Sequence, residues 1–185
     1  MESKSLLVVD DDESARRAVA YALRSEDYDV RLAAGVLEAL KLIHERPADV
    51  VVSDQMMPVM NGLQLMREVR KKLPDSIWII VTGCVELERL NAATLREGEV
   101  YRFLSKPWDQ LELQFTLRQA FERVALEREN RRLLASVRRQ SDFIRVLEAR
   151  HPRIFAKLRA ACGQADIGDL EPLGSYPATL RGLAG

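Results

Sequence analysis

Five short apolar runs, separated by segments of helical periodicity, constrain the fold of this 185-residue chain more than any other feature. Runs rich in valine, isoleucine and leucine are typical of strands buried on both faces. Their alternation with amphipathic segments predicts a parallel sheet covered by helices on both sides. We therefore expect an α/β fold with a five-stranded, doubly wound parallel sheet. The expected strands are residues 5–9, 29–33, 49–53, 77–82 and 100–104.

The segments between these strands predict the covering helices, because their apolar side chains recur at three- and four-residue spacing. Helical pattern resumes after Pro107 and contains no glycine or proline before Pro152, which is long for a globular helix. We expect its first part to cover the sheet through Leu111, Phe115 and Leu117. The shorter expected helices are residues 14–25, 36–44, 63–73 and 87–96.

This pattern predicts one domain with an appendage. We expect a globular domain over residues 1–118 and a long amphipathic or coiled-coil helix over 119–150. A C-terminal tail over 151–185 contains a short helical candidate at 154–161 and is followed by glycine- and proline-containing sequence. For this tail, a docking segment and partial disorder both stay open.

Polar side chains gather where the expected strands end. Asp10 and Asp11 follow the first strand, Asp54 follows the third, Thr82 ends the fourth, and Lys106 follows the fifth. In a doubly wound sheet these positions meet at one edge, where ligands bind. Clustered carboxylates suit a hard divalent cation such as Mg²⁺. A phosphoryl group arriving on one carboxylate would be stabilised by the cation, the ammonium and the hydroxyl.

The segments LLVVDDDE, SDQMMPVMNGLQL, IIVTG and YRFLSKPWD carry these residues, and together they resemble the receiver domains of two-component response regulators over about residues 4–118. The resemblance implies a flavodoxin-like receiver fold in which Asp54 accepts a phosphoryl group from a histidine kinase. It also implies that Asp11 binds Mg²⁺ directly, Asp10 assists through water and the Met56 backbone carbonyl completes the protein ligands. Lys106 would pair with the phosphoryl group.

The same resemblance implies a conformational switch, and not an enzyme with an external product. Thr82 would move toward the phosphoryl group, and Phe103 would change between exposed and buried positions as it does so. A static core aromatic is the alternative for Phe103. Asp12 extends the acidic pair, and we expect its side chain to face outward.

The long helix carries a heptad pattern of apolar residues after its sheet-covering part. β-Branched residues at a and leucines at d favour a parallel dimer, Asn130 at an a position would fix the register, and Gln140 weakens the seam. The alternative is a single amphipathic helix folded back on its own domain. The dimer seam comprises Leu126, Asn130, Leu133, Val137, Gln140, Ile144 and Leu147.

Composition and motifs narrow the output. The KPWD segment and long helix resemble regulators linked to cyclic di-GMP hydrolase or hydrogenase-type transcriptional outputs, but no such output domain is recognisable in this sequence. We expect signalling through protein contacts with an unknown downstream partner.

The short apolar run at the N-terminus is followed directly by three aspartates, which excludes a signal peptide, and no apolar run approaches the length of a bilayer span. We therefore expect a cytoplasmic protein without a membrane partner.

Arginine and lysine dominate the long helix, with twelve against five acidic residues between positions 118 and 159. We do not expect nucleic-acid binding, because the arginines are interleaved with the apolar seam and acidic residues interrupt them. A DNA-binding regulator that uses this basic helix stays as an alternative function. A phosphorelay intermediate is another.

Overall fold

The computed structural model describes residues 4–83 and 100–161. The chain forms two compact units, Met1–Asn130 and Arg131–Gly185. The first contains the sheet and its covering helices, and the second contains helical chain.

The first unit is built on a five-stranded parallel sheet in the order β2-β1-β3-β4-β5, as the apolar runs predict. The three central strands are buried almost throughout, because helices cover both faces. The strands are β1 (Lys4–Val9), β2 (Tyr28–Ala33), β3 (Val50–Asp54), β4 (Ile77–Gly83) and β5 (Arg102–Lys106).

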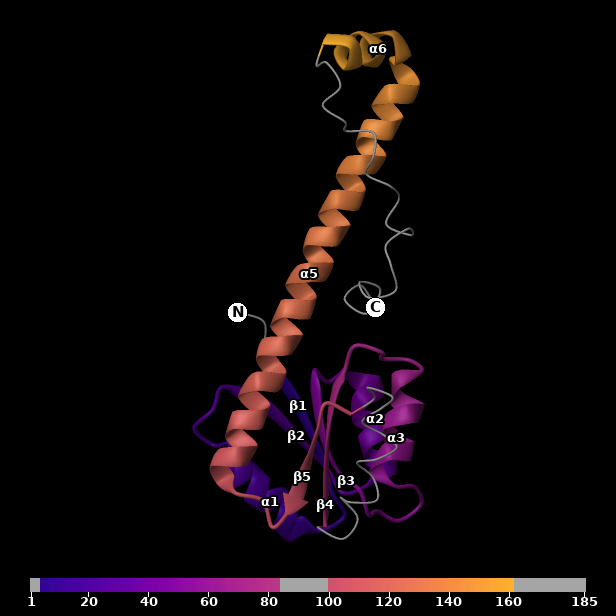
Figure 1. The fold of residues 1–185 in the computed structure, drawn as a ribbon. Helices are drawn as coiled ribbons and strands as arrows, with labels where there is room; N and C mark the ends of the chain where they lie inside the picture. Colours follow the sequence, from indigo (N-terminus) through magenta and orange to yellow (C-terminus); the bar gives the residue numbers. More distant parts are fainter. Residues whose placement is uncertain (1–3, 84–99, 162–185) are drawn as a thin grey trace. The chain divides into compact units, whose positions relative to one another are not determined.

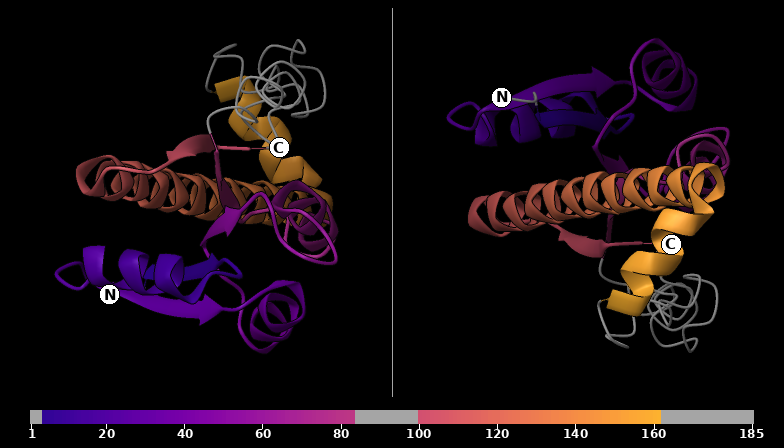
Figure 2. Two further views of the ribbon diagram at one scale, coloured as in Figure 1. Left: turned by 90° about the horizontal axis from the view of Figure 1, so that it is seen from below. Right: turned by 90° about the horizontal axis from the view of Figure 1, so that it is seen from above.

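Two helix layers enclose this sheet (Figures 1 and 2). Helix α1 (Glu13–Ala22) and the first part of α5 (Gln110–Arg150) share one apolar core with the sheet. Helices α2 (Val36–Glu45) and α3 (Gly62–Arg70) build a second core on the other face, around the fully buried Trp78. The helix expected over residues 87–96 lies outside the described residues.

Strand β5 begins two residues later than predicted. Val100 is buried in the second core, and the Tyr101 N–H donates to the Trp78 carbonyl before the paired strand begins at Arg102. The apolar run therefore marks the approach to the sheet as well as the strand. As a result Lys106 is the last residue of β5, paired with Gly83.

Helix α5 begins at Gln110, later than Pro107, because the Asp109 carboxylate accepts the backbone N–H groups of the first turn at 2.8 and 3.1 Å. The prediction that Leu111 and Phe115 cover the sheet is wrong. Their exposed fractions are 72% and 57%, whereas Leu117 is fully buried as expected. The buried stripe follows a different helix face and comprises Leu113, Thr116, Leu117, Ala120, Phe121 and Val124.

The contact of α5 with the first unit reaches beyond that stripe. Arg128 forms an ion pair with Asp49, and the second carboxylate oxygen of Asp49 accepts the Ser5 N–H at 3.1 Å. Since Ser5 lies in β1, this pair ties the helix to the amino-terminal ends of the strands. The boundary expected at residue 118 falls inside one continuous helix.

The second unit contains the remainder of α5 and a short helix, α6 (Pro152–Ala161). The sequence pattern predicts the short helix from residue 154, and it begins two residues earlier because proline fits the first turn. Leu133, Val137 and Ile144 of the expected seam are 56%, 50% and 49% exposed. Residues 162–185 lie outside the described part of the chain.

Candidate functional site

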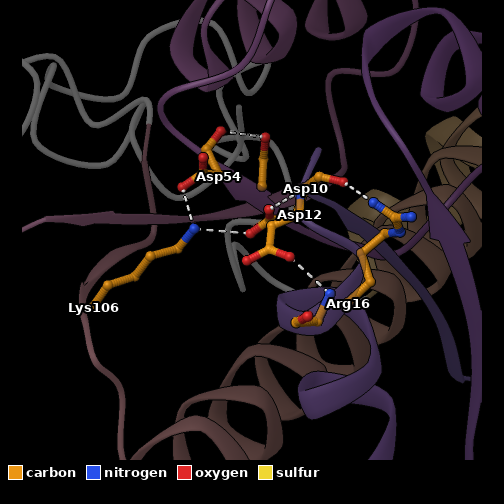
Figure 3. A network of polar contacts seen from close by, with 7 residues as sticks. Asp10, Asp12, Arg16, Asp54 and Lys106 are labelled. Carbon is orange, nitrogen blue, oxygen red and sulfur yellow. Dashed lines mark hydrogen bonds and ion pairs between the residues drawn. The ribbon is translucent and has the colours of Figure 1, made fainter.

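Three side chains from separate strands converge at the carboxyl edge of the sheet (Figure 3). Asp10 directly follows β1, Asp54 ends β3, and Lys106 ends β5. The Lys106 Nζ lies 2.8 Å from Asp54 Oδ1 and 2.9 Å from Asp10 Oδ2, so one ammonium bridges both carboxylates. Both aspartates are buried, whereas the Lys106 side chain stays about one-third exposed. Strand order thus assembles a charged site from residues far apart in sequence.

Asp11 adds a third carboxylate. Asp10, Asp11 and Asp54 each have a carboxylate oxygen within 4.8 Å of the others, and Asp11 is exposed at the mouth of this cluster. Within the described part of the chain, one ammonium, that of Lys106, contacts this cluster, so its three carboxylates need further positive charge. A divalent cation with oxygen ligands would supply it, and an exposed side leaves room for water or phosphate oxygens. The residues present therefore fit Mg²⁺.

The ionisation of Asp54 reflects its burial among these charged groups. Burial and the neighbouring Asp10 raise the pKa of the Asp54 carboxyl above its usual value, although Lys106 and a hydrogen bond from the Met56 backbone oppose the rise. Burial alone would lower the pKa of Lys106, but its hydrogen bonds to Asp54 and Asp10 raise it instead. Lys106 is therefore held in its protonated form, whereas burial disfavours the ionised form of the Asp54 carboxyl.

The loop after β1 holds Asp10 through its own backbone. The Asp12 N–H donates to Asp10 Oδ1 at 2.9 Å, and the Arg16 guanidinium donates to the Asp10 carbonyl at 2.7 Å. Asp12 itself is exposed, and its carboxylate caps α1 by accepting the Ser14 N–H at 2.8 Å. Asp12 thus does not belong to the carboxylate cluster, and it points outward as expected. The capping pattern Asp-x-Ser could have identified this role from sequence.

The junction between β3 and α3 fixes the backbone of Asp54. The Ser53 hydroxyl donates to the Asp54 carbonyl at 2.9 Å, and a Cβ at Gly62 would lie 2.4 Å from that carbonyl oxygen. Only glycine allows this approach. Gln55 is buried, and it accepts the Gly62 N–H on its carbonyl and the Leu63 N–H on its side chain. Sequence reasoning did not find these supporting contacts, because they depend on tertiary proximity.

The loop between these elements carries local backbone strain. Val59 has a φ of 77° and is 84% exposed, and the Met60 N–H donates to the Pro58 carbonyl across it. A β-branched residue rarely adopts this conformation. The strained turn lies in the loop of residues 55–61, which also contains Met56, the residue whose carbonyl is the predicted metal ligand.

The two predicted switch residues lie on adjacent strands. Thr82 is almost fully buried in β4, one position beyond the pair formed by Val81 and Asp54, so it reaches the same edge of the sheet. Phe103 is partly buried in β5 and packs against the core on the α2–α3 face. Their movement stays a prediction.

A parallel sheet of this order, with an acidic cluster and a lysine at its carboxyl edge, defines the receiver class of signalling domains. A family model described as the response regulator receiver domain matches residues 6–118. The chain therefore belongs to the response regulator receiver family of two-component systems, whose members are phosphoryl-accepting regulators.

Comparison with known proteins gives the same family. The hydrogenase transcriptional regulatory protein HoxA of Cupriavidus necator is 30% identical over 76% of this chain and 29% of its own length. The transcriptional regulatory protein GlrR of Escherichia coli is 35% identical over 77% of this chain and 32% of its own length. This chain thus spans about a third of the length of these relatives.

Solved structures share the fold. The signal receiver domain of an HD domain-containing protein from Pseudomonas fluorescens Pf-5 has a TM-score of 0.62 and 35% identity, covering 67% of this chain and 98% of that chain. NtrX from Brucella abortus has a TM-score of 0.65 and 30% identity, covering 71% of this chain and 30% of that chain. Within residues 4–83 and 100–161, no helix has the length and hydrophobicity needed to cross a bilayer.

Proposed function

We propose that this receiver accepts a phosphoryl group on Asp54 from a histidine kinase and signals through the exposed part of helix α5. The bridge of Lys106 between Asp54 and Asp10 carries the proposal. This contact places the Lys106 ammonium next to the buried Asp54 carboxylate, where the negative charge of a phosphoryl group would be added. Asp10 is also buried, lies at a strand end and contacts Lys106, but one of its carboxylate oxygens already accepts the Asp12 N–H. Asp54 is therefore the better candidate for the phosphoryl acceptor.

In the proposed reaction, a carboxylate oxygen of Asp54 attacks the phosphorus of a phosphohistidine. A P–O bond forms, the P–N bond breaks, and the imidazole leaves with the electron pair. Lys106 then pairs with the phosphoryl oxygens. Asp10, Asp11, Asp54 and the Met56 backbone carbonyl would hold Mg²⁺, which supplies further charge neutralisation when bound.

The added charge would shift a balance between two packings of the receiver. We assign Thr82 to the hydroxyl that turns toward the phosphoryl group, because its strand position brings it to the same edge. Phe103 would follow from its half-buried place in β5. This assignment rests on register and burial together with the family resemblance.

The output would be pairing of α5 with a second copy along the seam Leu126–Leu147. Leu126 is 66% exposed although it lies just two residues after the buried Val124, because two residues advance the helix by about 200°. The seam therefore does not compete with the receiver core for the same side chains.

Light scattering tests the proposal on the full chain, with and without beryllium fluoride and Mg²⁺ as a phosphoryl mimic. We expect the mimic to change the mass or shape of the wild type and to leave Asp54→Ala unchanged. Asp27→Ala removes an exposed carboxylate elsewhere on the receiver and should respond like the wild type. If the wild type ignores the mimic, or if Asp54→Ala responds equally, the proposal is wrong.

A further inference from the structure

The second unit is strongly basic, in contrast to the first. Residues 1–130 hold 18 Arg or Lys and 23 Asp or Glu, whereas residues 131–185 hold 10 and 5. The zero net charge of the whole chain hides this division. Charge segregation of this kind directs a polyanion toward one part of a molecule and away from the other.

Five of the six arginines that this unit contributes to α5 lie on one side of the helix, and Arg150 is the exception. Positions seven residues apart point in nearly the same direction, because seven residues make almost two helical turns. In heptad terms all five of the following arginines fall at b or c, whereas the seam occupies a and d on the opposite side, about half a turn away. We call this set the basic stripe: Arg131, Arg132, Arg138, Arg139 and Arg145.

The arginines alternate with the seam along the sequence, but they do not alternate with it in space. Every residue of the basic stripe is exposed, and Asp142 is the acidic residue that lies on the same side between positions 131 and 150. Glu148, the other acidic residue of that segment, falls at e beside the seam. The stripe is therefore a separate surface that stays open when the seam pairs.

We propose that the basic stripe binds the phosphate backbone of duplex nucleic acid without reading its sequence. From Arg131 to Arg145 it spans about 21 Å at a rise of about 1.5 Å per residue. A duplex presents one phosphate for about every 1.7 Å of its axis, so a straight row of cations meets many phosphates over that length. The stripe contains arginine and no lysine. The guanidinium group matches phosphate oxygens with two parallel hydrogen bonds.

Two other occupants fit this surface less well. A protein interface needs apolar or aromatic anchors at its centre. The f positions beside the arginines hold Ala135, Asp142 and Ala149, and Val146, at the c position after Arg139, is a large apolar side chain only at the end of the stripe. A lipid surface needs the apolar side of the helix to insert among acyl chains, and the proposed dimer buries that side. Interfaces with nucleic acid are polar and positively charged, as the stripe is.

Fluorescence anisotropy of the full chain with a labelled duplex of about 20 base pairs and arbitrary sequence tests the inference. The logarithm of the binding constant should fall linearly with the logarithm of salt concentration, with a slope of about −0.9 per phosphate contacted. The triple variant Arg131→Gln, Arg138→Gln, Arg145→Gln should bind at least tenfold more weakly at 50 mM salt. Its slope should be smaller in magnitude by about 2.7, since three contacts are lost.

A matched control removes three positive charges from the receiver instead, through Arg17→Gln, Arg24→Gln and Lys41→Gln, all exposed positions. It should bind the duplex like the wild type. Circular dichroism should show equal helicity for both variants, because glutamine and arginine have similar helix propensities. Light scattering should show unchanged mass, since b positions lie outside the seam.

Three results would overturn the inference: no duplex binding by the wild type at 50 mM salt, an equal loss of affinity in the receiver control, or capture by phosphatidylglycerol vesicles with no capture by duplex. The last result would assign the stripe to lipid headgroups. None of these outcomes depends on Asp54, so the inference and the proposed phosphorylation can fail separately.

Discussion

The two parts of helix α5 have opposite relations to their surroundings. Between Gln110 and Asn130 the helix buries a stripe of side chains against the receiver and ends that contact with the ion pair of Arg128 to Asp49. From Arg131 to Arg150 its large apolar residues are about half exposed or more, except Leu134 and Leu147, which are partly buried. One regular secondary structure thus serves first as a core element and then as a surface.

Residue types explain the difference. The receiver stripe recurs at spacings of three and four and contains leucine, alanine and phenylalanine next to a sheet that supplies the other half of the core. The distal part keeps the apolar spacing but places arginine on its far side. A helix with this pattern needs a partner for its apolar face, and its basic face stays in contact with solvent or with an anion.

The largest expected effect is a difference in the free energy of unfolding when one leucine is truncated in each part of α5. Leu117→Ala should lower the free energy of unfolding of the receiver by about 2–5 kcal/mol, because the fully buried side chain leaves a cavity. Leu133→Ala should change it by less than about 0.5 kcal/mol, since Leu133 is 56% exposed. Urea denaturation at low protein concentration measures both.

Light scattering completes this comparison. Leu133→Ala should weaken self-association, whereas Leu117→Ala should leave the seam intact while the receiver stays folded. Equal destabilisation by the two variants would show that the distal helix packs on the receiver, and the contrast between the two parts of α5 would be lost.

The fold followed from the sequence because parallel strands and their covering helices have strong patterns. Apolar runs mark buried strands wherever helices cover both faces, and β1, β3 and β4 lie within one residue of their predicted bounds. Strand β5 shifted because Val100 is apolar for packing in the core and not for pairing. Leu111 and Phe115 were misplaced because a long helix offers several apolar stripes, and tertiary contact selects one.

The candidate site was predictable to the extent that strand ends determine it. Asp10, Asp11, Asp54 and Lys106 are polar residues at the ends of apolar runs, and the structure brings them together. The supports of Asp54 were not predictable in the same way. The approach of Gly62 to the Asp54 carbonyl depends on where α3 begins relative to β3, which no local pattern encodes.

A smaller expected effect is stabilisation by Mg²⁺, which should arise in the receiver and not in the distal helix. Binding to the native carboxylate cluster stabilises the receiver by RT ln(1 + [L]/Kd), which is about 2.7 kcal/mol at one hundred times Kd. We expect Mg²⁺ to raise the Tm of the wild type. Asp11→Ala should lose that increment, and Asp12→Ala should keep it because Asp12 caps α1 outside the cluster. Differential scanning fluorimetry measures the shift.

The rise in Tm caused by Mg²⁺ distinguishes the receiver from the distal helix only if it arises in the receiver alone. The basic triple variant Arg131→Gln, Arg138→Gln, Arg145→Gln changes only the distal helix, so its Tm increment should equal that of the wild type. A reduced increment in that variant, or an undiminished increment in Asp11→Ala, would contradict the assignment of the cation to the acidic cluster.

The smallest expected effect is the pH dependence contributed by Asp54 in EDTA. Burial raises the pKa of this carboxyl in the native state. Its contribution to stability is therefore fully present below the unfolded-state pKa and is lost as pH rises through the native-state pKa. The unfolding free energy of the wild type minus that of Asp54→Asn, whose amide mimics the neutral acid, should fall as pH rises from the ordinary titration range of an aspartate into the range above it.

Urea denaturation of both proteins across that range gives the difference directly. Lys106 does not produce the slope, because its pKa is raised and its ammonium stays charged throughout this range. A difference that grows with pH would mean that attraction to Lys106 exceeds the cost of burying the carboxylate. Mg²⁺ should flatten or reverse the fall, because a cation in the cluster favours the ionised form that burial penalises. The same titration of the distal variant should follow the wild type, since its substitutions lie outside the receiver.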